Sequence, residues 1–140
     1  MSSGPEIELR QVPFVDLERL HEPIRAELDE ALLEASRRGD FILGGAVSEF
    51  EELFAAYTGA THAVGVASGT AALQLATEAL GIGPGDEVIV PAHTYIASAL
   101  GPLHAGAAPV FCDVEAESGL IDVESARAAI SERTRAIVAV

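Results

Sequence analysis

A run of small residues at 67–72 (ASGTAA) is the first place in the sequence where chemistry could sit. It follows a short apolar run and opens a stretch with helical spacing, so the N–H groups of a first helical turn would be left uncovered. Such a helix start suits a phosphate, because its N–H groups and the helix dipole both favour negative charge. Ser68 and Thr70 could add hydroxyl donors, and Gly69 permits close approach. A plain helix N-cap fits the same residues equally well.

The second candidate is the segment 91–95 (PAHTY), directly after the apolar run 87–90. In open parallel sheets ligands collect at the carboxyl ends of strands. An aromatic ring placed there, beside a phosphate site, could lie flat on a heteroaromatic ring, and Tyr95 is that ring. Taken alone, Tyr95 is more simply an ordinary, partly buried tyrosine. His93 could act as an acid or base near neutral pH, but it is more simply a hydrogen-bonded bystander.

The basic residues narrow the chemistry further. All 8 are arginines and the chain has no lysine. This excludes a Schiff base to a lysine of this chain and a phosphate loop of the G-x-x-x-x-G-K type. The glycine-rich run 81–85 precedes a strand and follows a helical stretch, the reverse of a dinucleotide-binding loop, so it predicts a turn. His21, His62 and His104 lack metal-ligand spacing, and no metal site is predicted.

Composition also excludes classes of partner. The chain has 140 residues, 49% of them hydrophobic, and a formal charge of −14. Nucleic acids and anionic membranes both reward clustered positive charge, so neither is expected as a partner. The sequence has no signal-peptide pattern and no apolar run approaching the ~20 residues of a membrane helix. Cys112 is the only cysteine and is interpreted as a buried, inert thiol, and a cytoplasmic location is expected.

Residues 21–60 are expected to form a helical segment after an N-terminal arm at 1–20. Apolar residues recur at helical spacing up to Gly39, which is placed to end the first helix. A second helix is predicted to begin near Ser48, because Ser48 and Glu51 have the spacing of a capping box.

From residue 61 onward, short apolar runs alternate with helical stretches. The apolar runs are continuous, which is typical of parallel strands covered by helices on both faces. The sequence therefore predicts an α/β fold with a mostly parallel sheet. Strands are predicted at 63–67, 87–90, 109–112 and 136–140, and helices at 70–80, 96–105 and 122–130. Because the last strand runs into the chain end, 61–140 is interpreted as an incomplete domain and the chain as truncated.

Several short motifs, weak singly but specific in their order and spacing, resemble those of the DegT/DnrJ/EryC1/StrS sugar aminotransferases, within the aspartate-aminotransferase fold (fold type I). The motifs are VPFVDL (12–17), FILGG (41–45), ASGTAAL (67–73), GIGPGDEVIVP (81–91), TY (94–95) and PVFCDV (109–114). The resemblance covers essentially 12–140. It implies a three-layer α/β/α large domain that binds pyridoxal 5'-phosphate (PLP), of which 61–140 would be a part.

The resemblance assigns roles to the two candidate sites. The backbone at Gly69 and Thr70, with Ser68 and the Thr70 hydroxyl, would hold the PLP phosphate, and Tyr95 would stack on the pyridine ring. PLP would act as the electron sink that takes an amino group from a donor and passes it to a sugar ketone. The expected substrate is a nucleotide-linked keto-sugar, and the expected donor is glutamate or glutamine.

The same resemblance implies a second chain and a missing part. Phe41, Leu43 and Gly44 would lie near the active site of a dimer mate, because members of the family work as homodimers. The lysine that forms a Schiff base with PLP, and the acidic residue on the pyridine nitrogen, would lie downstream of Val140. The 140-residue chain contains no catalytic residue of this kind and is expected to be inactive alone.

Three other interpretations stay open. A dehydratase of the same family would carry histidine at the downstream lysine position, so the residue there decides between the two enzymes. A non-catalytic remnant or regulator that keeps the cofactor pocket is the interpretation without an enzyme, and a stop codon after Val140 would favour it. An unrelated dinucleotide-binding oxidoreductase is the weakest, because its glycine fingerprint is missing.

Overall fold

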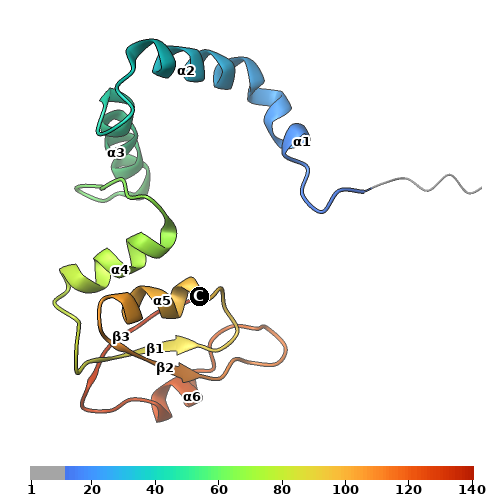
Figure 1. Cartoon of the computed structure of the whole chain (residues 1–140). Helices are drawn as coiled ribbons and strands as arrows, with labels where there is room; N and C mark the ends of the chain where they lie inside the picture. The colour runs from blue at the N-terminus through green and yellow to red at the C-terminus, as the bar shows by residue number, and fades with distance from the viewer. Residues whose placement is uncertain (1–11) are drawn as a thin grey trace, which may run out of the picture. The chain divides into compact units, whose positions relative to one another are not determined.

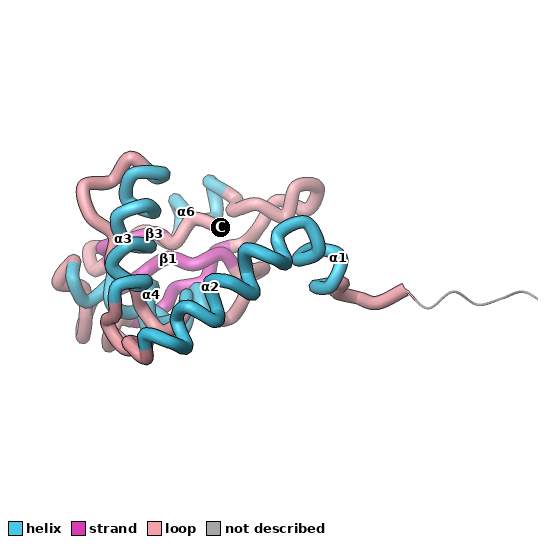
Figure 2. The backbone as a smooth tube through the Cα atoms, turned by 90° about the horizontal axis from the view of Figure 1, so that it is seen from above, coloured by secondary structure: helices cyan, strands magenta, loops and turns pink. Residues whose placement is uncertain are grey.

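The computed structural model, drawn in Figures 1 and 2, describes residues 12–140. The chain divides into two compact units, with the division between Ala63 and Val64. Residues 1–11, the first part of the predicted arm, lie outside the described residues. Among the helices of residues 12–140, none has the length and apolar character needed to cross a membrane.

The first unit is built of helices. Its elements are α1 (Leu17–His21), the 3-10 helix η1 (Glu22–Ile24), α2 (Arg25–Arg38) and α3 (Gly45–Thr58). The predicted end at Gly39 is confirmed: Gly39 adopts a left-handed φ of 68°, and its N–H donates to the Ala35 carbonyl at 3.0 Å. The helix before it is divided, because Pro23 lies in η1 and its missing N–H interrupts the hydrogen-bond ladder between α1 and α2.

The capping box predicted at Ser48 and Glu51 is wrong. The helix α3 begins at Gly45, so Ser48 lies inside it. Gly44 is the N-cap residue, and the Oδ2 atom of Asp40 accepts the N–H of Gly45 at 2.9 Å. The Asp40 carboxylate, in the turn before α3, therefore accepts an N–H of the first turn of the helix, the role that was predicted for the Ser48 hydroxyl.

The second unit is an α/β unit. Its elements are α4 (Gly69–Ala79), β1 (Glu87–Pro91), α5 (Ala97–His104), β2 (Ala108–Cys112), α6 (Val123–Ala128) and β3 (Thr134–Ile137). The strands form a parallel sheet in the order β2-β1-β3. The predicted α/β class with a parallel sheet is confirmed.

The core of this unit lies on both faces of β1. Every residue of β1 is buried, whereas β2 and β3 mix buried or half-buried residues with exposed ones. Val88 packs with Ala99 of α5 on one face, and Ile89 packs with Cys112 of β2 and Ala126 of α6 on the other. Figure 1 shows α5 and α6 on opposite sides of β1. Cys112 is the buried thiol that the sequence predicts, and burial raises its pKa. Helices therefore cover both faces at the centre of the sheet.

Two predicted strands differ from the structure. Residues 63–67 form no strand, because a strand needs a neighbour to complete its hydrogen bonds and this run pairs with no strand of the described residues. The last strand is Thr134–Ile137, earlier than the predicted 136–140, because the hydrogen bonds to β1 already begin where the Glu87 N–H donates to the Arg133 carbonyl at 2.8 Å. Its ladder still extends beyond the strand, since the Val138 N–H donates to the Ile89 carbonyl at 2.9 Å.

Candidate functional site

Both predicted ligand junctions lie at the carboxyl edge of the sheet in the second unit. The helices α4 and α5 end in turns that lead into the amino ends of β1 and β2, so both helices begin at the opposite, carboxyl edge. They pack side by side (Figure 1), and a Cβ built at Gly101 of α5 would lie 2.5 Å from the Cβ of Leu73 in α4. This close packing places residues 68–70 and Tyr95 at one edge.

The start of α4 has the geometry of a capped helix, with open space around the Cα atom of Gly69. Ser68 is the N-cap, and its Oγ accepts the N–H of Ala71 at 3.1 Å. The N–H groups of Gly69 and Thr70 belong to a first turn that has no acceptors within the helix. A Cβ at Gly69 would meet no atom within 4 Å. The two interpretations of this segment are therefore compatible, because Ser68 caps the helix through the Ala71 N–H while the N–H groups of Gly69 and Thr70 have no acceptor within the helix.

Tyr95 presents its ring to solvent, with 77% of the residue exposed. Its carbonyl accepts the N–H of Ser98 at 3.0 Å, and the Oγ1 of Thr94 lies 3.0 Å from the Oγ of Ser98. Sequence reasoning missed this hydroxyl pair, whose only signal is a threonine and a serine one helical turn apart at a helix start. His93 is exposed, and a Cβ at Gly119 would lie 3.8 Å from its Nδ1.

The three residues predicted for a dimer-mate site belong to the first unit. Phe41 and Leu43 are 69% and 84% exposed, and Leu43 adopts a φ of 50° in the turn before α3. A Cβ at Gly44 would lie 1.8 Å from the Asp40 carbonyl oxygen, so only glycine fits this turn. The loop is therefore a tight turn that presents large apolar side chains.

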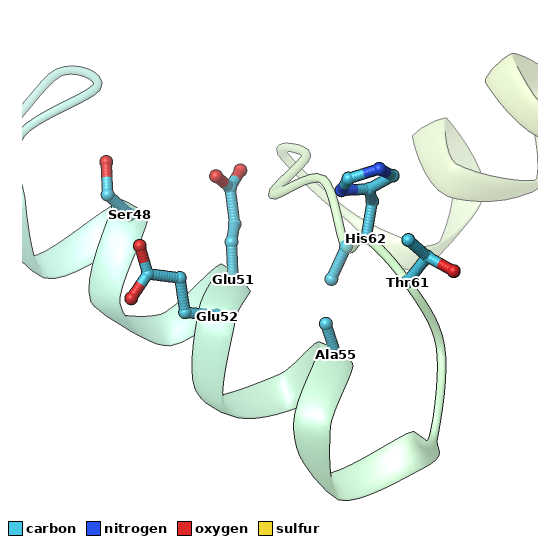
Figure 3. Close-up of a pocket in the computed structure, with 7 residues that line it drawn as sticks. Ser48, Glu51, Glu52, Ala55, Thr61 and His62 are labelled. Atoms are coloured by element: carbon cyan, nitrogen blue, oxygen red, sulfur yellow. The ribbon is translucent and has the colours of Figure 1, made fainter.

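A separate cavity of about 310 Å³ lies within the first unit (Figure 3). Ser48, Glu51 and Glu52 extend into it from α3, and His62 extends from the segment that follows (Figure 3). Two carboxylates would repel a phosphate, so the cavity does not suit that group. Across residues 12–140, no three His, Cys, Asp or Glu side chains converge as metal ligands would.

The amino edge of the sheet holds a cluster of charged side chains. The Glu87 carboxylate accepts hydrogen bonds from the Ser131 hydroxyl and from the Arg133 guanidinium, whose Nε lies 2.9 Å from Oε1. The Ser131 hydrogen bond and then the Arg133 contact lower the pKa of Glu87, although burial acts in the opposite direction. Beside this pair, Arg135 Nε lies 3.2 Å from Asp86 Oδ1.

These charged residues coincide with an irregularity in the sheet. Glu87 pairs with Thr134, but Val88 pairs with Ala136, which leaves Arg135 without a partner residue on β1. An extra residue of this kind is a β-bulge, and it sets the register of everything after it. The contacts to Glu87 and Asp86 therefore lie next to the bulge that sets the register of β3 against β1.

Comparison with known proteins identifies the family. The sequence profile of the DegT/DnrJ/EryC1/StrS aminotransferase family matches residues 22–140. The chain belongs to this family. The resemblance of the short motifs is thereby confirmed over most of the sequence.

Two relatives in the family are sugar aminotransferases. The chain is 48% identical over 133 residues to the dTDP-3-amino-3,4,6-trideoxy-alpha-D-glucose transaminase of Streptomyces venezuelae, covering 95% of this chain and 35% of the relative. It is 40% identical over 129 residues to the UDP-2-acetamido-2-deoxy-3-oxo-D-glucuronate aminotransferase of Pseudomonas aeruginosa, covering 92% of this chain and 36% of that protein. The chain thus spans little more than a third of the length of these family members.

Solved structures in the family agree with the fold. The structure of Streptomyces venezuelae DesV in complex with a ketimine intermediate matches with a TM-score of 0.86 and 48% identity, over 92% of this chain and 35% of DesV. Bacillus subtilis NtdA with bound cofactor PMP matches with a TM-score of 0.82 and 31% identity, over 93% of this chain and 30% of NtdA. The NtdA structure therefore carries the cofactor PMP on a fold that includes an α/β unit like this one.

Proposed function

We propose that this chain is the amino-terminal part of a PLP-dependent aminotransferase that transfers an amino group to a nucleotide-linked keto-sugar, with glutamate or glutamine as the donor. The observation that carries the proposal is the carboxyl edge of the second unit, which holds both a capped helix start with open space at Gly69 and an exposed aromatic ring. The family and the sugar substrates in the names of the two relatives support the reaction class.

The residues at this edge fit PLP. A phosphate needs N–H donors and positive potential, and the first turn of α4 offers both. The open space at Gly69 permits close approach of the phosphate oxygens, and Thr70 can add its hydroxyl. A pyridine ring needs a flat apolar surface, and the exposed ring of Tyr95 provides one.

When bound, PLP supplies an electron sink for the electron pair left on the donor carbon as its proton leaves. The residues of this chain bind and orient that group: Gly69 and Thr70 would hold the phosphate, and Tyr95 would fix the plane of the ring. A proton carrier is still required, and this chain has no lysine. We propose that a lysine and an acidic partner for the pyridine nitrogen follow in the part of the relatives' length that this chain does not span.

The proposal extends to assembly and location. We propose that the full-length protein, meaning this chain extended over the length of its relatives, is a cytoplasmic homodimer. Phe41, Leu43 and Gly44 would then lie near the partner's active site. The exposed apolar side chains of this tight turn support the proposal, because such side chains gain most from burial against another surface. Sedimentation of the full-length protein tests it, and a monomer would refute it.

Two substitutions of the N-cap test the phosphate site. Aspartate and asparagine both cap helices about as well as serine, so Ser68→Asp and Ser68→Asn should leave stability nearly unchanged. Only the aspartate adds a negative charge beside the phosphate. In the full-length protein, Ser68→Asp should weaken PLP binding by about tenfold or more, while Ser68→Asn should stay within about threefold.

Pyridoxal, which lacks the phosphate, is the matched probe. Its affinity should not distinguish the aspartate variant from the asparagine variant, because the repelled group is absent. Equal PLP affinity in the two variants would show that the PLP phosphate does not bind at the start of α4. The residue at the downstream lysine position distinguishes the two proposed activities. A lysine there supports the aminotransferase, and a histidine would support the dehydratase instead.

A further inference from the structure

The loop between β1 and α5 is tied by a side-chain contact that the proposed function does not use. The Oγ1 of Thr94 and the Oγ of Ser98 lie 3.0 Å apart. Ser98 is buried, with 7% of the residue exposed, and Thr94 is half-buried. A buried hydroxyl without a partner is costly, so the Ser98 hydroxyl depends on Thr94.

The two residues of this contact lie on either side of Tyr95 in the sequence. Thr94 precedes it, and Ser98 both bonds to Thr94 and donates its backbone N–H to the Tyr95 carbonyl at 3.0 Å. A serine inside a helix usually bonds to the carbonyl of the residue four positions earlier. Here the Ser98 hydroxyl bonds to the side chain at that position, so the pair tethers the residue before Tyr95 to the buried face of α5.

The ring of Tyr95 has no comparable support of its own. The residue is 77% exposed, and within residues 12–140 the aromatic pair in the structure is Phe50 with Phe54, in another helix. The backbone of the loop therefore sets where the ring is attached and the direction of its Cα–Cβ bond. The N-cap of α5, Ile96, makes no side-chain capping hydrogen bond, which leaves the hydroxyl pair as the side-chain tether of this helix start.

We propose that Thr94 and Ser98 are positioning residues that hold Tyr95 in place for the PLP ring. The inference rests on the proposed function, in which Tyr95 carries that ring. Ser98 is buried and acts only through Thr94 and the backbone, and Thr94 acts through the loop. Neither residue needs to touch the cofactor.

Three variants of the full-length protein test the pair. Thr94→Val keeps the shape and loses the hydroxyl, Ser98→Ala loses the partner hydroxyl, and Thr94→Ser keeps the hydroxyl without the methyl group. Thr94→Val and Ser98→Ala should each weaken PLP binding by about three- to tenfold. The double variant should bind PLP about as tightly as the single variant with the lower affinity, because both substitutions break the same contact. Thr94→Ser should bind PLP as the unmodified protein does.

A spectroscopic signal and a matched control separate positioning from loss of stability. The visible circular dichroism of bound PLP reports how firmly its ring is held, and it should fall in Thr94→Val and recover in Thr94→Ser. Ser131→Ala removes a hydroxyl of the same kind at the amino edge, and it should lower stability without changing PLP affinity or this signal. Ser98→Ala removes a single atom from a buried site, so it keeps the test informative if Thr94→Val does not fold.

Each outcome decides one of the two proposals. If Tyr95→Ala weakens PLP binding but Thr94→Val and Ser98→Ala do not, the tether is refuted and the cofactor site stands. If Thr94→Val weakens binding and Ser98→Ala does not, Thr94 touches the cofactor directly and the tether is again refuted. If Tyr95→Ala leaves PLP affinity unchanged, the assignment of Tyr95 fails and the inference fails with it.

Discussion

The two edges of the sheet in the second unit differ in kind. At the amino edge, Glu87 bonds to Ser131 and Arg133, and Asp86 pairs with Arg135. Charged groups from β1 and from the chain entering β3 satisfy one another there. The carboxyl edge has no such pairing of these charged groups and instead holds the start of α4, capped by Ser68, and the exposed ring of Tyr95.

The difference teaches which edge stabilises the fold and which one has groups to offer a ligand. Opposite charges at the amino edge already pair within the chain, next to the register shift of β3. Uncharged N–H groups and a π-face at the carboxyl edge gain a partner only when something binds. Substitutions of the charged residues at the amino edge should therefore change stability and leave PLP affinity unchanged. Substitutions of the exposed groups at the carboxyl edge should change PLP affinity with little effect on stability.

The largest effect is expected from Ile89→Ala, in the middle of β1. Ile89 is 0% exposed and packs against α6, so removing its side chain leaves a cavity between the two edges. The free energy of unfolding should fall by roughly 2–5 kcal/mol, measured by denaturant titration of the full-length protein, and PLP binding should fall with it. Arg127→Ala, whose side chain is 73% exposed on α6, is the control and should stay within about 0.5 kcal/mol. A large loss of stability with unchanged PLP affinity would show that the carboxyl edge does not depend on the core of this sheet.

A smaller, pH-dependent effect is expected from Glu87→Gln. The pKa of Glu87 is lowered in the folded chain by its Ser131 and Arg133 contacts, so the ionised form stabilises the fold at pH values above the ordinary value of 4.5. That contribution is lost as the pH falls through the lowered pKa, because the folded carboxylate is then protonated. The glutamine variant should therefore be less stable than the unmodified protein at pH 7, and the difference should shrink as the pH is lowered below 4.5.

An exposed glutamate provides the control for this pH effect. The side chain of Glu124 on α6 is 83% exposed, and Glu124→Gln should show no such pH-dependent difference. PLP affinity of Glu87→Gln, measured at pH 7, should match that of the unmodified protein. Weaker PLP binding in this variant would show that the two edges are coupled.

The sequence predicted the features that local residues decide. Gly39 ends its helix in a left-handed conformation, and the continuous apolar run at β1 is buried throughout. The junction before α4 could be located because an apolar run, small residues and a helical pattern follow one another within a few positions. Whether Ser68, Gly69, Thr70 and Tyr95 bind PLP stays a prediction.

The features that were missed depend on residues distant in the sequence or on three-dimensional packing. Glu87 and Arg133 are 46 positions apart, so no local pattern announces their contact. The run 63–67 has the composition of a strand, but pairing is decided by a neighbour that the run itself does not specify. The capping box failed because Ser48 and Glu51 match a spacing rule while Asp40 reaches the helix start from outside it.

The smallest effect is expected from substitutions that keep a large apolar side chain at position 95 and differ in whether it is aromatic. Tyr95→Phe keeps the aromatic face and should bind PLP nearly as well as the unmodified protein. Tyr95→Leu keeps an apolar side chain but has no π-face, and it should weaken PLP binding by about 0.5–1.5 kcal/mol, measured by absorbance titration of the full-length protein. Neither variant should change the free energy of unfolding without PLP, because the ring is 77% exposed. A leucine variant that binds as well as phenylalanine would mean that Tyr95 contributes apolar area without stacking. The carboxyl edge would then bind PLP through apolar contact with the Tyr95 side chain and through the start of α4.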